Sequence, residues 1–370
     1  MSRIVAARLV RLVVPFRVPL RTADRTWTER RLGLVGLIDA DGRQGLGELA
    51  ADDAWDQPIW ATAERDLAAL LGREVVDAVD ATSGTRAVAA AISTAALDLL
   101  ARTSGRSLAA ELDAWLDGPS GEEPRILGSV RVNALIGGEG TDEQVRAALA
   151  AVGRGSTCLK LKAIRGASVG ALVESIGAVR WAVGSSVQLR LDANGVWTED
   201  QASAYLGALA DPQLDLEYVE QPVRPELGLA VLGRVRRAAH VPIAADESVL
   251  DLAAAERLLA ADAVDVLVVK PARVGGPLEA VRIARLAQAH GVPTVLSTWF
   301  ETGIGLAAAL HVAALLPGDG PAHGLDTAAL LADDLVLSDL RPVEGRLALP
   351  PGPGLGVAID DAAMERYRVG

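Results

Sequence analysis

The sequence is poor in lysine. Only three of its 36 basic residues are lysine, and these are Lys160, Lys162 and Lys270 in a chain of 370 residues. Arginine stays protonated under any condition that a protein meets, whereas a buried lysine can lose its proton near neutral pH and act as a general base. The three lysines are therefore candidates for chemistry that arginine cannot perform. The alternative is that an arginine-rich composition left three lysines by chance.

Cysteine, histidine and long apolar runs are scarce as well. The single Cys158 excludes an intrachain disulfide framework, fits a reducing cytoplasm, and is most simply a small buried strand residue. Four histidines without an H-E-x-x-H motif argue against a histidine-based zinc site. No uninterrupted apolar run has the length of a membrane span, and the arginine-containing N-terminus is unlike a signal peptide. We expect a cytoplasmic protein with no membrane partner.

Charge and motif content exclude further classes of function. The formal net charge is −12 and the sequence has no basic stripe, which argues against a nucleic-acid partner. The C-x-x-C, G-x-x-x-x-G-K-[ST] and G-x-S-x-G signatures are absent. The sequence carries no signal for an oligomeric state.

The first third of the chain predicts an α+β unit. Residues 1–50 are typical of strands, with Asp41-Gly42 as a hairpin turn between two apolar segments. Residues 60–117 predict helices rich in alanine and leucine. A loop rich in glycine, proline and acidic residues follows, so we expect a domain boundary near residues 118–128.

The rest of the chain alternates between short apolar strands and amphipathic helices. The predicted strands are 130–136, 158–162, 187–194, 216–222, 242–247, 264–271, 293–300 and 323–327. Eight such strands predict a parallel sheet closed into a (β/α)₈ barrel. The alternative is an open doubly wound sheet, but no G-x-G-x-x-G follows a strand.

Polar residues stand at the ends of these strands. They are Lys162, Asp192 with Asn194, Glu220 with Gln221, Asp246 with Glu247, Lys270, and Ser297 with Thr298. Their spacing is close to one βα unit, which returns each group to the same end of a barrel. Active sites of this fold lie at the carboxyl ends of the strands. Strand alternation places Lys160 and Lys162 on one face, and Arg190 and Asp192 on one face, which must be the barrel interior.

Three carboxylates are expected to converge at this end of the barrel. Asp192, Glu220 and Asp246 come from adjacent strands, and their repulsion would cost several kcal/mol without compensation. A hard divalent cation with oxygen ligands resolves this, with Mg²⁺ favoured and Mn²⁺ as the alternative. In the other interpretation the carboxylates form structural ion pairs with Lys162, Lys270 and Arg190.

The two outer lysines suggest the reaction. Lys162 and Lys270 lie on strands at opposite sides of the barrel axis, so a bound substrate would have an amine over each face. This layout suits proton abstraction from a carbon acid, in which the metal holds a carboxylate and stabilises an enediolate. We therefore expect a small anionic carboxylate as the substrate.

Taken together, the motifs "KLK", "LDAN", "VEQP", "AADES" and "VVKP" resemble those of the enolase superfamily, in its muconate lactonizing enzyme subgroup. The stretch "DGRQGLGE" is similar to the superfamily's amino-terminal hairpin. The resemblance implies a modified (β/α)₈ TIM barrel with an α+β capping domain. It also implies that residues 1–122 form the capping domain, that 123–340 form the barrel, and that 341–370 return to the capping domain.

Within the superfamily, "LSTWFETGIG" and "HGLDT" resemble motifs of the o-succinylbenzoate synthase family of menaquinone biosynthesis. The resemblance implies a lyase that syn-dehydrates 2-succinyl-6-hydroxy-2,4-cyclohexadiene-1-carboxylate through an enediolate. Lys162 would remove the α-proton, Lys270 would steady the enediolate, and Lys160 would lower the pKa of Lys162. The implied metal ligands are Asp192, Glu220 and Asp246. The implied substrate contacts are Ser297, Thr298, Arg190 and Asn194, supported by Glu247 and Asp326.

The identity of the substrate depends on two further regions of the chain. Trp299 and Phe300 are bulky for a stretch that is small and serine-rich in some members. The loop 21–27 should help close the pocket, with Arg21, Arg25 and Trp27 as candidates, although each is equally well a solvated loop residue.

Other reactions use the same constellation. An N-succinylamino acid racemase or dipeptide epimerase would use both lysines as acid and base, and a muconate-type cycloisomerase is a further alternative. Asp326 has no second aspartate two residues away, which argues against the epimerase. The non-enzymatic alternative is a barrel-fold binding protein that has lost catalysis.

Overall fold

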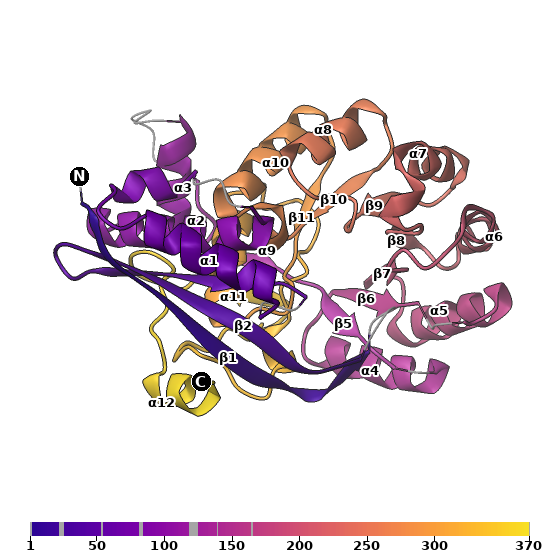
Figure 1. The fold of residues 1–370 in the computed structure, drawn as a ribbon. Coiled ribbons are helices and arrows are strands. Elements are labelled where there is room, and N and C mark those ends of the chain that lie inside the picture. The colour runs from indigo at the N-terminus through magenta and orange to yellow at the C-terminus, as the bar shows by residue number, and fades with distance from the viewer. Residues whose placement is uncertain are drawn as a thin grey trace.

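The computed structural model describes residues 2–21, 26–52, 55–80, 84–117, 125–138, 140–163 and 166–369. Figure 1 shows two parts of the molecule. One is an antiparallel sheet covered by helices, and the other is a curled parallel sheet surrounded by helices.

Three strands form the amino-terminal sheet. They pair antiparallel in the order β1-β2-β3, with bounds Ile4–Arg21, Thr26–Asp39 and Gln44–Leu49. The turn before β3 contains the predicted Asp41-Gly42 pair, and Gly42 has a φ of 79°, which glycine adopts without steric penalty. The predicted β-rich start and its hairpin are confirmed.

Helices cover one face of this sheet. Their bounds are α1 Gln57–Ala69, α2 Arg86–Ser104 and α3 Leu108–Asp117, with a 3₁₀ turn η1 at Val75–Ala78. Gly45 and Gly47 let α2 lie directly on β3, because a Cβ at either position would overlap a backbone carbonyl of the helix. Helix α2 is long and apolar enough to span a membrane, but 67% of its most apolar window is buried inside the protein, as in a core helix.

The second part is a seven-stranded parallel sheet in the order β11-β10-β9-β8-β7-β6-β5. The bounds are β5 Ala134–Ile136, β6 Cys158–Lys162, β7 Gln188–Asp192, β8 Leu216–Glu220, β9 Ile243–Ala245, β10 Val266–Val269 and β11 Thr294–Leu296. The helices are α4 Thr141–Gly153, α5 Val169–Val183, α6 Glu199–Leu209, α7 Leu229–Ala238, α8 Leu252–Ala260, α9 Pro271–Val274, α10 Pro277–Ala289 and α11 Gly303–Ala313. Short 3₁₀ turns occur at η2 Pro225–Leu227 and η3 Ala328–Leu330.

Two predicted strands differ from the structure. The predicted strand 323–327 contributes only bridges at His323 and Gly324, after which the backbone turns. These two residues still close the ring. Their hydrogen bonds are His323 N to Arg131 O (2.8 Å), Asn133 N to His323 O (2.9 Å) and Gly324 N to Leu296 O (2.8 Å). The predicted strand 130–136 is divided into β4, Ser129–Arg131, and β5.

The carboxyl-terminal segment returns to the amino-terminal part. β12, Arg346–Ala348, pairs antiparallel with β4, and helix α12, Asp361–Tyr367, packs beside β1 (Figure 1). The backbone N–H of Val369 donates to the carbonyl of Arg11 at 3.0 Å. The fold is a modified TIM barrel with a capping domain, as predicted, and the limits at residues 122 and 340 stay predictions.

A buried carboxylate joins the two parts. Glu48 on β3 accepts hydrogen bonds from Thr302 N (3.0 Å), Thr302 Oγ1 (2.7 Å) and Gly305 N (3.1 Å) at the start of α11. Burial, reinforced by the nearby Glu301, raises the pKa of Glu48 from 4.5 to about 7. The amino-terminal end of α11 favours a negative charge, which gives this contact its orientation.

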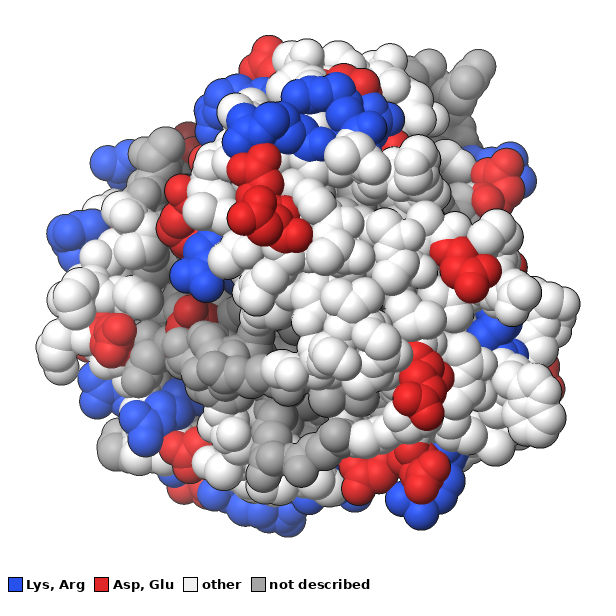
Figure 2. Space-filling view, turned by 90° about the vertical axis from the view of Figure 1, so that its right-hand side faces the viewer, with Lys and Arg blue, Asp and Glu red and all other residues white. Residues whose placement is uncertain are grey.

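Figure 2 shows the face on which α5, α6 and α7 lie. Acidic and basic side chains are interspersed there among uncharged ones, with basic side chains gathered toward the upper edge. Among the described residues of this face, no basic stripe runs across the surface. The absence of a nucleic-acid partner stays a prediction.

Candidate active site

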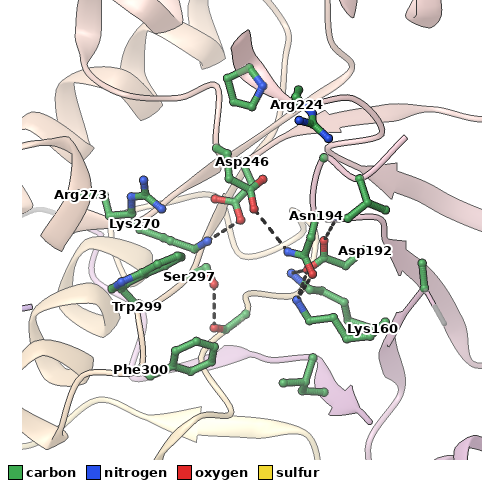
Figure 3. Close-up of a pocket in the computed structure, with 18 of the residues that line it drawn as sticks. Lys160, Asp192, Asn194, Arg224, Asp246, Lys270, Arg273, Ser297, Trp299 and Phe300 are labelled. Atoms are coloured by element: carbon green, nitrogen blue, oxygen red, sulfur yellow. Dashed lines mark hydrogen bonds and ion pairs between the residues drawn. The ribbon is translucent and has the colours of Figure 1, made fainter. Parts of the chain in front are cut away.

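A cavity of about 910 Å³ lies at the carboxyl ends of the barrel strands. All three lysines of the chain line it, together with Asp192, Asp246 and other residues that follow a strand. Figure 3 shows Lys270 and Asp246 on one side of this cavity and Lys160 and Asp192 on the other, with Arg224 and Phe300 at its margins. The predicted convergence of strand ends is confirmed.

Lys160 lies between two carboxylates. Its Nζ is 2.6 Å from Glu220 Oε1 and 3.0 Å from Asp192 Oδ2. Burial alone would lower the pKa of Lys160, but the two carboxylates more than offset this effect, so the pKa lies well above the usual 10.5. Lys160 is therefore a constant positive charge beneath the cavity.

Lys162 lies nearer the opening. Its Nζ donates to Asp192 Oδ2 at 2.8 Å and to Asn194 Oδ1 at 2.7 Å. The amide of Asn194 donates in turn to Glu247 Oε1 at 3.3 Å. Asn194 has a φ of 48°, a left-handed conformation that asparagine tolerates better than most residues. The amine of Lys162 is thus oriented by two oxygen acceptors at the mouth of the barrel.

Lys270 on the opposite wall has a different environment. Its Nζ donates to Asp246 Oδ2 and lies 4.9 Å from the ring centre of Trp299. The guanidinium carbon of Arg273 lies 4.3 Å from the same ring centre. An aromatic face attracts cations, so the Trp299 ring stabilises the positive charges of both Lys270 and Arg273 on this side of the cavity.

Besides Asn194, two further residues after the strands adopt left-handed backbone conformations. Gln221 has a φ of 40°, and its Oε1 accepts hydrogen bonds from the backbone N–H groups of Asp246 (3.0 Å) and Ser248 (3.1 Å). Phe300 has a φ of 58°, which is unfavourable for a bulky residue. Such strain persists only where surrounding contacts impose it, and it is typical of functional sites.

The sequence matches the enolase C-terminal domain-like family over residues 143–363, which is more than half of the chain. The chain belongs to the enolase superfamily. An N-succinylamino acid racemase from Amycolatopsis sp. is 32% identical over 95% of this chain and 93% of its own length. An o-succinylbenzoate synthase from Thermobifida fusca is 40% identical over 60% of this chain and 67% of its own length.

Solved structures of superfamily members have the same fold. The L-Ala-D/L-Glu epimerase from Bacillus subtilis, solved as a substrate-liganded complex, has a TM-score of 0.84 and 26% identity, covering 96% of this chain and 98% of that one. Muconate lactonizing enzyme from Pseudomonas fluorescens superimposes with a TM-score of 0.88 over the whole of both chains at 24% identity.

Members of the superfamily use a divalent metal ion, typically Mg²⁺, and the donor set of this chain fits one. Within the described residues, no three acidic, histidine or cysteine side chains form a ready-made metal cluster, because lysine amines lie between the carboxylates. The donors are nevertheless hard oxygens, and Glu220 Oε2 is buried without a hydrogen-bond partner. Burial, opposed by Lys160 and reinforced by the neighbouring aspartates, raises the pKa of Glu220 from 4.5 to about 8.

Most predicted contact residues line the cavity. Ser297 Oγ donates to the carbonyl of Gly324 at 3.3 Å, and Thr298 and Thr327 share a hydroxyl hydrogen bond of 3.0 Å. Burial, followed by repulsion from Asp246, raises the pKa of Glu247 from 4.5 to about 7. The cavity is also lined by other residues that were considered above as candidates, namely Asn194, Asp326, Trp299, Phe300 and Trp27. Arg25 and the side chain of Arg21 lie outside the described residues.

The predicted substrate contact of Arg190 is wrong. Its side chain is fully buried below the cavity, where it donates to Glu217 Oε2 at 2.6 Å and to Asn133 Oδ1 at 3.0 Å. A register shift between β7 and β8 accompanies this pairing. Arg190 is a structural group of the barrel interior, and it does not pair with the three carboxylates.

Sequence reasoning missed several residues of the cavity wall. Arg224 and Arg273 line it from the loop after β8 and from α9, and Trp197 stacks on Tyr205 with ring centres 4.6 Å apart. Each of these residues follows a strand end or stands in the next helix. Their places after strands were a usable signal, because loops at the carboxyl ends of barrel strands build the site.

Proposed function

We propose that this enzyme is an o-succinylbenzoate synthase of menaquinone biosynthesis. The observation that carries the proposal is the unequal environment of the two outer lysines. Lys270 is held between the Asp246 carboxylate and the Trp299 ring, contacts that suit a fixed cation. Lys162 faces the opening and is oriented by Asp192 and Asn194. One lysine that moves a proton and one that stays a cation are what a one-base elimination requires.

The proposed reaction begins at Lys162. Its neutral amine removes the α-proton of 2-succinyl-6-hydroxy-2,4-cyclohexadiene-1-carboxylate, and the electron pair of the broken C–H bond forms an enediolate. The enediolate collapses, the carbon–oxygen bond to the ring hydroxyl breaks, and the Lys162 ammonium protonates the departing oxygen on the same face. The products are o-succinylbenzoate and water, and Lys162 is neutral again.

The remaining charges support this transfer. Asp192, Glu220 and Asp246 would hold a divalent cation, which would bind the substrate carboxylate and favour the negative charge that develops on it. Lys270 would lie beside the enediolate as a cation. Lys160, which stays protonated, would add a fixed positive charge beside Asp192 and Glu220.

Racemisation of N-succinylamino acids is the second candidate. It is favoured by the racemase relative, whose similarity extends over 95% of this chain. A racemase needs an acid and a base on opposite faces of the substrate, so Lys270 would have to exchange a proton as Lys162 does.

Variants of Lys270 distinguish the two candidate functions. Purified protein with Mg²⁺ is assayed for dehydration by absorbance and for α-proton exchange of N-succinylamino acids in D₂O. A synthase in which Lys270 is only a cation keeps measurable dehydration in Lys270→Arg and loses it in Lys270→Ala. Wild-type protein that exchanges the α-proton but does not dehydrate the cyclohexadiene would show that the racemase is the correct assignment.

A further inference from the structure

A second cavity, of about 460 Å³, lies at the opposite end of the barrel from the active site. It is built from residues that precede the barrel strands, including β4 and the loop 317–321 before the closing segment at His323. Three arginines line it, and they are Arg125, Arg131 and Arg346.

Two of these arginines are placed directly opposite each other. In the antiparallel pair of β4 and β12, Arg131 and Arg346 are Cα partners. Directly opposed residues in such a pair have Cβ atoms about 5 Å apart, and like charges there are destabilising. Both side chains are nevertheless held in place. Arg346 donates to Ser129 Oγ at 3.0 Å and to Ser129 O at 2.9 Å, and Arg131 donates to the carbonyl of Gly320.

The opposed charges have little compensation within the protein. Among the described residues that line the cavity, Asp319 is the single acidic one, and no ion pair to Arg125, Arg131 or Arg346 occurs in the described part of the chain. Arg234, by contrast, is an exposed arginine that pairs with Glu199 at 2.7 Å.

A cavity of about 420 Å³ adjoins the basic one, and it is lined mainly by apolar residues together with the ion-paired Asp113 and Arg285. The two share Pro317, Gly320, Pro321 and His323 as a common wall. Its other lining residues include Val281, Ala284, Val292, Leu315 and Leu316. The hydroxyl of Thr294, which also lines it, is buried and has no hydrogen-bond partner in the protein. Unpartnered buried polar atoms are rare in folded proteins, so this hydroxyl is a polar group of the cavity wall that the protein itself leaves unsatisfied.

His323 offers a further donor to both cavities. Its Nδ1 accepts a hydrogen bond from the backbone N–H of Leu296 at 3.1 Å, so in the neutral ring the proton is on Nε2. Burial, followed by the positive charges of Arg190 and Arg131, lowers the pKa of His323 from 6.5 to about 3. The ring is therefore neutral at physiological pH and can donate to an anion.

We propose that these two cavities form one binding site for a small organic anion, in which an oxyanion lies between Arg131 and Arg346 and an attached apolar body enters the neighbouring cavity. Guanidinium groups bind carboxylate and phosphate oxygens through paired hydrogen bonds, and two opposed guanidiniums supply the positive charge that a dianion needs. The site shares no catalytic group with the active site, and it does not depend on the reaction proposed above.

The test is calorimetric titration of the full chain with Mg²⁺, using phenyl phosphate, benzoate and inorganic phosphate as probes. The variant is Arg131→Gln/Arg346→Gln. The matched control is Arg234→Gln/Arg341→Gln, which removes two exposed arginines that are paired with acids. Thermal unfolding and turnover of each variant show that the fold and the active site are retained.

We expect phenyl phosphate or benzoate to bind the wild type and the control equally, and to bind Arg131→Gln/Arg346→Gln at least tenfold more weakly. The stronger of the two probes identifies phosphate or carboxylate as the oxyanion. Inorganic phosphate should bind more weakly than phenyl phosphate because it cannot use the neighbouring cavity. No binding to the wild type, the same affinity in both double variants, or equal affinity for phenyl and inorganic phosphate would overturn the proposal.

Discussion

Two layers of the barrel interior carry buried charge, and they differ in balance and in access. The upper layer holds the lysines with Asp192, Glu220, Asp246 and Glu247, so that four carboxylates meet three amines beside a cavity. The lower layer pairs Arg190 with Glu217, one charge for one, and Arg190 has no exposed surface. An excess of charge beside a cavity indicates chemistry, and a matched pair away from the cavity indicates structure. The inward direction of a charged side chain is common to both layers and does not separate them.

Replacing Arg190 should produce the largest loss of stability. Arg190→Met leaves Glu217, whose side chain is 23% exposed, and the buried amide oxygen of Asn133 without a donor, which should lower the free energy of unfolding by roughly 1–3 kcal/mol. KM should stay unchanged in the protein that remains folded, because Arg190 does not line the cavity.

Denaturant unfolding and steady-state kinetics check this prediction, with Arg234→Met as the control. Arg234 pairs with Glu199 at the surface, where removal of a pair changes stability by about 0–1 kcal/mol. If the Arg190→Met protein keeps full stability but has a raised KM, Arg190 belongs functionally to the upper layer.

Replacing Glu220 should affect metal binding more than folding. Changes around metal ligands already weaken metal affinity about 10- to 100-fold, so Glu220→Gln should weaken Mg²⁺ binding by at least about tenfold. Calorimetric Mg²⁺ titration measures this effect. An unchanged Mg²⁺ affinity would remove Glu220 from the ligand set.

The same variant should also change how stability depends on pH. Burial raises the pKa of Glu220 in the folded protein from 4.5 to about 8, so between these pH values the folded state binds a proton that the unfolded chain has released. The free energy of unfolding of the metal-free wild type should therefore fall as pH rises from 4.5 to 8. In Glu220→Gln the free energy of unfolding should fall less steeply with pH, as measured by denaturant unfolding at several pH values. The same pH dependence in the wild type and the variant would contradict the raised pKa of Glu220.

Removing the aromatic ring beside Lys270 should have the smallest effect. Trp299→Leu loses a cation–π contact of about 0.5–2 kcal/mol, which corresponds to roughly a 2- to 30-fold fall in kcat. Trp181→Leu is the control, since Trp181 is 90% exposed on α5 and far from the strand ends in sequence. Equal kcat in both variants would show that the ring does not act on Lys270.

Much of the upper layer could be predicted from the sequence. One βα unit separates successive strand ends. A closed barrel therefore brings the residues at these ends together, namely Lys162, Asp192, Glu220, Asp246 and Lys270. Alternation along a strand also predicted correctly that Arg190 and Asp192 share a face. It does not report depth, which is why the depth of Arg190, below the cavity, was missed.

The remaining differences have local causes. The segment 323–327 was predicted as a strand, yet closing the ring needs only His323 and Gly324 to pair on both sides. Arg224 and Arg273 lie on a loop and a short helix whose paths depend on tertiary contacts, which no periodic pattern in the sequence encodes.

Lys162 is the proposed base, and its replacement by alanine or arginine is the decisive experiment. Dehydration of 2-succinyl-6-hydroxy-2,4-cyclohexadiene-1-carboxylate is followed with Mg²⁺ for the wild type, Lys162→Ala and Lys162→Arg, with thermal unfolding as the check on folding. Loss of general base catalysis lowers kcat about 10²- to 10⁴-fold, and arginine should not restore it because it stays protonated. Activity of Lys162→Arg close to that of the wild type would show that this position supplies only a positive charge, and would contradict the account.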